Sequence, residues 1–190
     1  MSGRDWVLEP AFERPFQVVA SREVARAGDV GLRMDTLRWP EGRETSHRVI
    51  ETPSAVWMVP VFESGDTVLV RQWRHPWNRV SWEVPAGTLE PGEEPLPAAR
   101  RELAEEAGLT AEGWLSLGRT RGSAALTGVQ HLFLAQNLTS VGRRPEVAEA
   151  DMIVRRLPLR QALAAAFDGT IEHATSIAAL CRAGRILGLL

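Results

Sequence analysis

The sequence predicts a mixed α/β fold, in which a mixed sheet is flanked by helices. Segments rich in β-branched and aromatic residues alternate with segments whose apolar residues recur at helical spacing. No repeat or low-complexity tract interrupts this alternation. The chain of 190 residues fits one domain with a small accessory sheet, and it is long enough to bury a full core.

Most of the first half of the chain is expected to form strands. The segments 56–62 and 67–73 predict a hairpin, because the intervening turn at 63–66 supplies a glycine for its awkward backbone angle. The other expected strands are 16–26, 30–39, 45–51, 81–84, 114–119, 130–138 and 153–157. The expected helices are 95–107, 159–167 and 174–187.

The helix expected at 95–107 has clear start and stop signals. Pro95 and Pro97 fall in the first turn, where the backbone N–H groups lack intrahelical partners anyway. Gly108 follows the last turn and suits the left-handed residue that ends a helix. The apolar stripe that faces the core consists of Leu96, Ala99 and Leu103.

Three carboxylates stand on one side of this helix. Glu102, Glu105 and Glu106 occupy positions i, i+3 and i+4, where like charges repel one another. A hard cation such as Mg²⁺ or Mn²⁺ reverses that effect, because it prefers oxygen ligands and neutralises the cluster. The alternative is a solvated helix face whose acids are screened by Arg100 and Arg101.

The acids belong to a longer pattern that begins before the helix. It consists of Gly87, five residues, Glu93, seven residues, and then the run Arg101-Glu102-Leu103-Ala104-Glu105-Glu106-Ala107-Gly108-Leu109. This pattern resembles the signature of the Nudix hydrolases at every specified position. The resemblance implies an α/β/α sandwich with an N-terminal β extension, and an enzyme that uses divalent metal ions to cut a nucleoside diphosphate linked to another group.

The same resemblance implies roles for individual residues. Two or more ions, Mg²⁺ or Mn²⁺, would be held by Glu102, Glu105, Glu106 and the carbonyl of Ala86. Arg101 is interpreted as an ion-pair partner that orients Glu93 or Glu105, since a planar guanidinium suits that task. Gly87 and Gly92 are expected to be loop residues with unusual backbone angles, and Gly87 also lets the main chain approach the metal.

Further segments resemble the ADP-ribose pyrophosphatase branch of these hydrolases. They are Val70-Arg71-Gln72-Trp73-Arg74, the run Trp82-Glu83-Val84-Pro85-Ala86-Gly87, and the tail segments 157–163 and 169–175. In that branch an N-terminal extension forms strands exchanged between two subunits, so residues 1–50 are expected to be this extension in a homodimer and 51–190 the Nudix domain. One departure is that 122–128 lacks the proline of the branch's Ser-Pro-Gly turn, so another nucleoside diphosphate sugar would fit as well as ADP-ribose.

Arginines and further carboxylates complete the predicted site. Arg74, and secondarily Arg71, would clamp the phosphate that is not attacked, although both would equally suit a solvated strand surface. The loop at 144–151 would supply the general base, with Glu149 preferred over Glu146. The alternatives are that this loop is only a solvated acidic segment, or that Glu105 is the base.

Tryptophans near the motif are candidates for stacking on a nucleotide base. Trp77 lies in a loop and Trp82 in the strand before the motif, and either could bind a purine ring, although core or dimer-interface packing is the commoner role of tryptophan. His75 and His131 lack the spacing of a metal site, and His131 is interpreted as an inner residue of its strand.

Composition excludes several classes of function. The formal net charge of -2 argues against a nucleic-acid-binding surface as the main purpose. No segment approaches the roughly 18 apolar residues of a membrane span, and the start shows no signal-peptide pattern. The single cysteine, Cys181, excludes an internal disulfide and fits a reducing cytoplasm; its apolar surroundings indicate helix packing rather than a catalytic thiol.

Three functions of different kinds remain open at this point. The favoured one is hydrolysis of a nucleoside diphosphate sugar, with a small-molecule nucleotide as substrate. The second is hydrolysis of a nucleoside triphosphate or a dinucleoside polyphosphate by the same chemistry. The third is a non-catalytic module that senses a nucleotide, which is disfavoured because a sensor need not keep three repelling glutamates.

Overall fold

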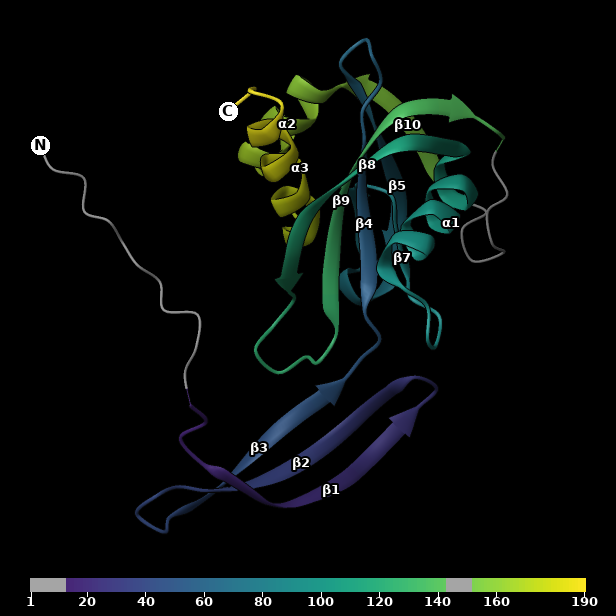
Figure 1. The fold of residues 1–190 in the computed structure, drawn as a ribbon. Coiled ribbons are helices and arrows are strands. Elements are labelled where there is room, and N and C mark those ends of the chain that lie inside the picture. The colour runs from purple at the N-terminus through teal and green to yellow at the C-terminus, as the bar shows by residue number, and fades with distance from the viewer. Residues whose placement is uncertain (1–12, 143–151) are drawn as a thin grey trace, which may run out of the picture. The chain divides into compact units, whose positions relative to one another are not determined.

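The computed structural model of the protein describes residues 13–142 and 152–190. The chain divides into two compact units, Met1–Glu51 and Thr52–Leu190. Within these described residues, the first unit contributes a sheet of three strands, and the second contributes two further sheets and three α-helices (Figure 1).

The first unit is an antiparallel sheet with little core of its own. β1 (Gln17–Ala27) pairs with β2 (Val30–Arg38), and β2 pairs with β3 (Glu44–Glu51). Every residue of β1 is exposed, and Leu37 is the one buried apolar side chain among the described residues of this unit. An isolated sheet of this kind buries too little surface to be stable without other contacts.

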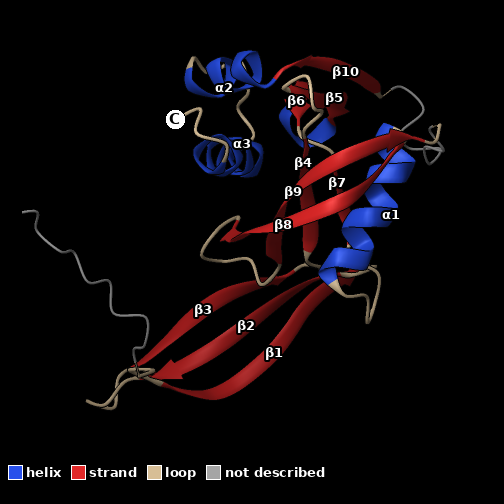
Figure 2. Ribbon diagram, turned by 45° about the horizontal axis from the view of Figure 1, so that its top comes forward, coloured by secondary structure: helices blue, strands red, loops and turns tan. Residues whose placement is uncertain are grey.

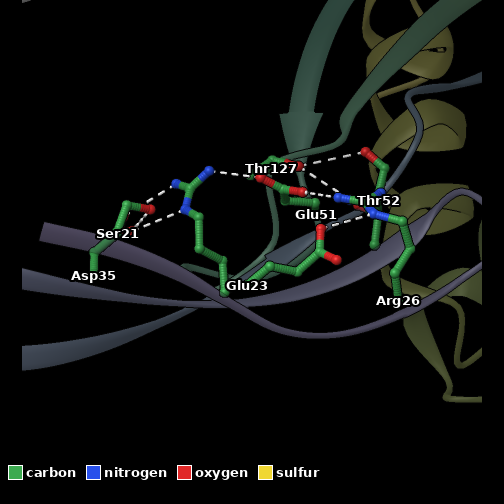
Figure 3. Close-up of polar contacts among 8 residues, drawn as sticks. Ser21, Glu23, Arg26, Asp35, Glu51, Thr52 and Thr127 are labelled. Atoms are coloured by element: carbon green, nitrogen blue, oxygen red, sulfur yellow. Dashed lines mark hydrogen bonds and ion pairs between the residues drawn. The ribbon is translucent and has the colours of Figure 1, made fainter.

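A chain of charged hydrogen bonds ties these strands together. Glu51 accepts hydrogen bonds from Arg26 Nη2 and Arg33 Nη1, both at 2.6 Å. Arg33 Nε also donates to Asp35 at 2.8 Å, and Ser21 Oγ donates to the same carboxylate at 2.7 Å. The hydrogen bonds from Arg33 and Ser21 hold the pKa of Asp35 below its ordinary value. Figure 3 shows how the labelled members of this network lie across the sheet.

The second unit contains two sheets. The first has the order β7-β4-β9-β8 and the second the order β10-β5-β6. β4 runs parallel to β9, whereas the other named pairs are antiparallel, so the sheet is mixed. The strands are β4 (Ala55–Pro60), β5 (Asp66–Arg74), β6 (Arg79–Glu83), β7 (Ala86–Thr88), β8 (Leu109–Arg121), β9 (Val129–Ser140) and β10 (Ile153–Pro158).

Helices cover both faces of the β7-β4-β9-β8 sheet, as Figures 1 and 2 show. α1 (Pro95–Ala107) packs on the face that receives Val56 and Met58 of β4. α2 (Leu159–Phe167) and α3 (Ala174–Ile186) pack on the face that receives Trp57 and Val59. Because successive strand residues point to opposite faces, β4 contributes side chains to both hydrophobic cores of an α/β/α sandwich.

The structure confirms the expected fold class, and it differs in detail. α1 and α2 have the expected bounds, and α1 ends at Gly108, whose φ of 66° is left-handed. β8 is much longer than expected, because it starts directly after α1 and pairs with β9 along its whole length. The short strand β7 and the 3-10 turn η1 (His75–Trp77) were not expected. Among the described residues, every helix falls short of the length and apolar character that a membrane crossing requires.

Candidate functional site

A cavity of about 470 Å³ opens where β4, β5 and β7 meet the carboxylate face of α1. It brings two acids of the helix together with two arginines and a stretch of main chain. Its lining residues are Ala55, Trp57, Gln72, Arg74, Ala86, Gly87, Thr88, Leu89, Glu90, Arg101, Glu102 and Glu106.

The three carboxylates of α1 do not occupy equivalent positions. Glu102 and Glu106 are buried, with 8% and 3% of their surface exposed, and both line the cavity. Glu105 is half-buried, lies outside the lining and pairs with Arg101 at 3.2 Å. Burying two carboxylates is costly unless each has a partner, so their surroundings must compensate the charge.

Arg101 supplies much of that compensation. Its guanidinium donates to Glu93 from Nε at 3.2 Å and from Nη2 at 2.9 Å, to Glu102 at 2.8 Å and to Glu105 at 3.2 Å. Nη2 also donates to the carbonyl of Thr88 at 3.2 Å. Arg101 therefore lies where an orienting ion-pair partner would lie. The hydrogen bonds from Arg101 hold the pKa of Glu93 below its ordinary value.

Gly87 is required by close packing rather than by an unusual backbone angle. It lies in β7, and it is not among the glycines with positive φ. A Cβ at this position would lie 1.8 Å from Cδ of Glu102. The expectation of a strained loop conformation was therefore wrong for Gly87, whereas Gly92 does adopt a φ of 81°.

The main chain before Gly87 is held from both sides. The N–H of Ala86 donates to Glu106 Oε2 at 2.8 Å, and the carbonyl of Pro85 accepts from the N–H of Met58 at 2.9 Å. On the α3 side, the N–H of Val84 donates to Ser176 Oγ at 3.2 Å. These bonds fix the segment whose Ala86 carbonyl is a candidate metal ligand.

Arg74 lines the cavity while it forms an ion pair with a buried carboxylate. Its Nε and Nη2 donate to the two carboxylate oxygens of Glu83 at 2.8 and 2.6 Å, and Glu83 is fully buried. Burial opposes ionisation of Glu83, but the hydrogen bonds and charge of Arg74 outweigh it, so the pKa of Glu83 lies below its ordinary value. Arg71, on the same strand, does not line the cavity.

Among the aromatic side chains, Trp57 lines the cavity and the predicted candidates do not. Trp82 faces a second cavity beside α2, and Trp77 is 45% exposed on η1. The ring of His173 links two of them: it stacks on Trp57 at 4.4 Å between centroids and lies 5.8 Å from Trp77. The sequence did not identify Trp57 as a site residue, because a tryptophan within an apolar strand is usually interpreted as part of the hydrophobic core.

The oxygen donors at this site fit a hard divalent cation. Carboxylates and a backbone carbonyl are the ligands that Mg²⁺ and Mn²⁺ prefer, and the lack of a Cβ at Gly87 lets the carboxylate of Glu102 lie against the main chain next to Ala86. Within residues 13–142 and 152–190, no three acidic, histidine or cysteine side chains converge on one point as they stand. Glu146 and Glu149 lie outside the described residues.

The loop at 122–128, which lacks the expected proline, is held by other means. Thr127 Oγ1 accepts from the N–H of Thr52 at 3.1 Å (Figure 3). The N–H of Gly128 donates to Thr52 Oγ1, also at 3.1 Å. A Cβ on Gly128 would lie 2.3 Å from the carbonyl oxygen of Pro53. Close packing of main chain therefore fixes the end of the loop, which does not line the cavity.

Comparison with known proteins adds independent information. Residues 51–180 match the model of the NUDIX domain. The chain is 34% identical to an ADP-ribose pyrophosphatase of Mycobacterium tuberculosis (strain ATCC 25618 / H37Rv) over 170 residues, which cover 87% of this chain and 82% of that protein. It is 30% identical to an ADP-ribose pyrophosphatase of Bacillus subtilis (strain 168) over 149 residues, 77% of this chain and 80% of that protein.

A solved structure described as an ADP compounds hydrolase has the same fold. It superposes with a TM-score of 0.82 at 20% sequence identity, over 95% of this chain and 100% of that one.

The half-buried ring of His173 predicts a pH dependence of stability. Burial lowers the pKa of His173 below its ordinary value. Between the folded-state and the unfolded-state pKa, the unfolded chain therefore binds a proton that the folded chain does not bind. The free energy of unfolding should therefore fall as the pH drops below about 6.5, by up to about 1.4 kcal/mol per pH unit, until the pH reaches the folded-state pKa. His173→Asn should lessen this slope, as measured by urea unfolding at about pH 7.5 and about pH 5.5. Equal slopes in the two proteins would contradict it.

Proposed function

The chain belongs to the Nudix family of hydrolases, and on that premise we propose that it hydrolyses the diphosphate of ADP-ribose or a closely related nucleotide sugar. The products are a nucleoside monophosphate and a sugar phosphate. The observation that carries this proposal is the cavity, whose lining brings together the buried carboxylates Glu102 and Glu106 and the guanidinium of Arg74. Acids that hold cations and an arginine that reads phosphate are what diphosphate hydrolysis requires.

Two or more divalent ions, Mg²⁺ or Mn²⁺, are proposed to bind at the acidic side of the cavity. Glu102, Glu106 and the carbonyl of Ala86 would hold them, with Glu105 joining when its contact with Arg101 opens. When bound, such ions polarise phosphoryl oxygens and lower the pKa of a bound water. The contacts that support this assignment are those of Arg101, which hold Glu102 at the cavity without filling it.

Arg74 is proposed to bind the phosphate that is not attacked. Glu83 accepts hydrogen bonds from Nε and from one Nη2 hydrogen of Arg74. The remaining N–H groups of this guanidinium, which lines the cavity, are left to bind phosphate. A guanidinium held in this way donates hydrogen bonds to phosphate oxygens with defined geometry, because its N–H groups lie in one plane. Arg71 is retained as a weaker candidate because it lies on the same strand but outside the cavity lining.

In the reaction, water attacks one phosphorus, the bridging P–O bond breaks, and a general base takes a proton from the water. Glu149 is proposed as that base, with Glu146 second and Glu105 as the alternative within α1. Trp57 forms the aromatic wall of the cavity, while Trp77 and Trp82 remain candidates for contacts with the nucleotide base.

The first unit is proposed to mediate a homodimer. All of β1 is exposed, and its exposed apolar residues include Val18, Val19 and Val24. A sheet with this little core gains stability when a second copy covers it. Light scattering that gives the mass of a monomer would contradict this assignment.

The single cysteine supports a cytoplasmic location.

Incubation with ADP-ribose and Mg²⁺ tests the proposed function. The expected products are AMP and ribose 5-phosphate, identified by chromatography, and chelation of the metal should stop their release because the carboxylates alone cannot activate water. Nucleotide sugars with other bases and sugars, together with nucleoside triphosphates, form the comparison panel. Pyrophosphate released only from a triphosphate, or nucleotide affinity without any turnover, would overturn the assignment.

Gly87→Ala should disable the site while leaving the fold intact. The added Cβ would meet the Glu102 side chain, which must swing out of the cavity, and a flexible side chain can do so without unfolding the protein. Turnover with Mg²⁺ should fall about 10- to 100-fold, the usual effect of disturbing a metal ligand. Gly113→Ala in β8 is the matched control, because its Cβ would make an ordinary contact with Gln136 at 3.5 Å. Full activity in Gly87→Ala would refute this role of the glycine.

Glu149→Gln should cut turnover by about a hundredfold or more, since the amide cannot accept the proton of the attacking water. Glu146→Gln serves as the paired variant and should lose much less. Steady-state turnover of both variants with ADP-ribose and Mg²⁺ decides between them. If Glu149→Gln keeps wild-type turnover, the base lies elsewhere.

A further inference from the structure

The residue that caps the N-terminus of α3 is unusual for its position. His173 is the N-cap of the helix, and its Nδ1 accepts the N–H of Ser176 at 3.2 Å. Asparagine, aspartate and serine are the preferred residues at an N-cap, because a short polar side chain reaches the free N–H groups best. An imidazole caps the helix no better than asparagine would. Capping alone therefore does not explain why a histidine occupies this position, which suggests that the ring has a second role.

That second role is visible in the contacts of the ring. The His173 imidazole stacks on the Trp57 indole with 4.4 Å between centroids and 21° between planes. Trp57 belongs to β4 and lines the cavity that contains Glu102 and Glu106. Its other polar contact is at the edge of the ring, where Nε1–H donates to Gln130 Oε1 at 2.7 Å. The indole is thus held at its edge by β9 and on its face by α3.

Ser176 sets the orientation of the imidazole. Its N–H and its hydroxyl both lie against Nδ1, at 3.2 and 3.0 Å, so Nδ1 is an acceptor and the ring proton belongs on Nε2. The same hydroxyl oxygen accepts the N–H of Val84, and Ser176 is fully buried. The ring is therefore fixed relative to both the helix and the cavity wall.

We propose that His173 is a positioning residue, which holds Trp57 in the wall of the cavity and thereby sets the affinity for substrate. This role rests on the proposed function, because the cavity is where the nucleotide sugar would bind. It assigns a task at the active site to the last helix of the chain, which carries none of the motif residues.

Two variants separate this role from helix capping. His173→Asn keeps a capping acceptor and loses the stack, whereas His173→Phe keeps a ring against Trp57 and loses the acceptor. At about pH 7.5, where His173 is neutral in both the folded and the unfolded chain, His173→Asn should raise KM for ADP-ribose about three- to tenfold with little change in kcat or in the urea midpoint. His173→Phe should show the reverse, with a lower urea midpoint and nearly wild-type KM. If KM simply follows stability in both variants, the ring only caps the helix and the proposal fails.

A double-mutant cycle with Trp57→Leu, which removes the ring that His173 stacks on, tests the route of the effect. If His173 acts through Trp57, His173→Asn should change KM much less in the Trp57→Leu background than in the wild type. Additive effects on KM would overturn the proposal. The cycle is measured on ADP-ribose, or on whichever nucleotide of the comparison panel the wild-type enzyme turns over. Lack of turnover with ADP-ribose would thus count against the substrate assignment and leave the positioning role to be decided by the cycle.

Discussion

The organisation of the site depends on a single guanidinium. α1 places three carboxylates within little more than one turn, and two of them are buried, an arrangement that is unfavourable in isolation. Arg101 offsets this by donating to Glu93, Glu102 and Glu105 and to the carbonyl of Thr88. Because these acceptors come from the helix, from the loop before it and from β7, one side chain joins three consecutive parts of the chain around the cavity.

The sandwich puts this charged cluster at the junction of two hydrophobic cores. Val56 and Met58 pack toward α1, while Trp57 packs toward α2 and α3, so β4 is shared by both cores. Because successive strand residues point to opposite faces, the ring of Trp57 reaches the cavity while its neighbours Val56 and Met58 are fully buried on the other face. A rigid strand holds Trp57 more firmly than a loop would, which suits a residue in the wall of a binding site.

The sequence predicted most of the fold because its signals are local. The bounds of α1 follow from Pro95 at one end and Gly108 at the other, and both act within one turn of the helix. β8 was shortened in the prediction because its residues do not alternate between buried and exposed. Its length is set instead by pairing with β9, and that register is not visible in one segment.

The site was predicted less completely, for a similar reason. Arg74 was identified, but its partner Glu83 depends on the antiparallel register of β5 and β6. Gly87 was expected to have an unusual backbone angle, which it lacks, and only the packed structure reveals how near Glu102 lies. Trp57 was missed because a tryptophan within an apolar strand is typical of a core residue, and only the folded structure shows that it lines the cavity.

The hydrogen bonds of residues 84–86 also tie together parts of the chain that lie far apart in sequence. This tripeptide is anchored by Met58 of β4, by Glu106 of α1 and by Ser176 of α3. All three anchors exist only when these three elements are folded together. Local unfolding of α3 therefore removes one of the supports of the main chain that enters the cavity.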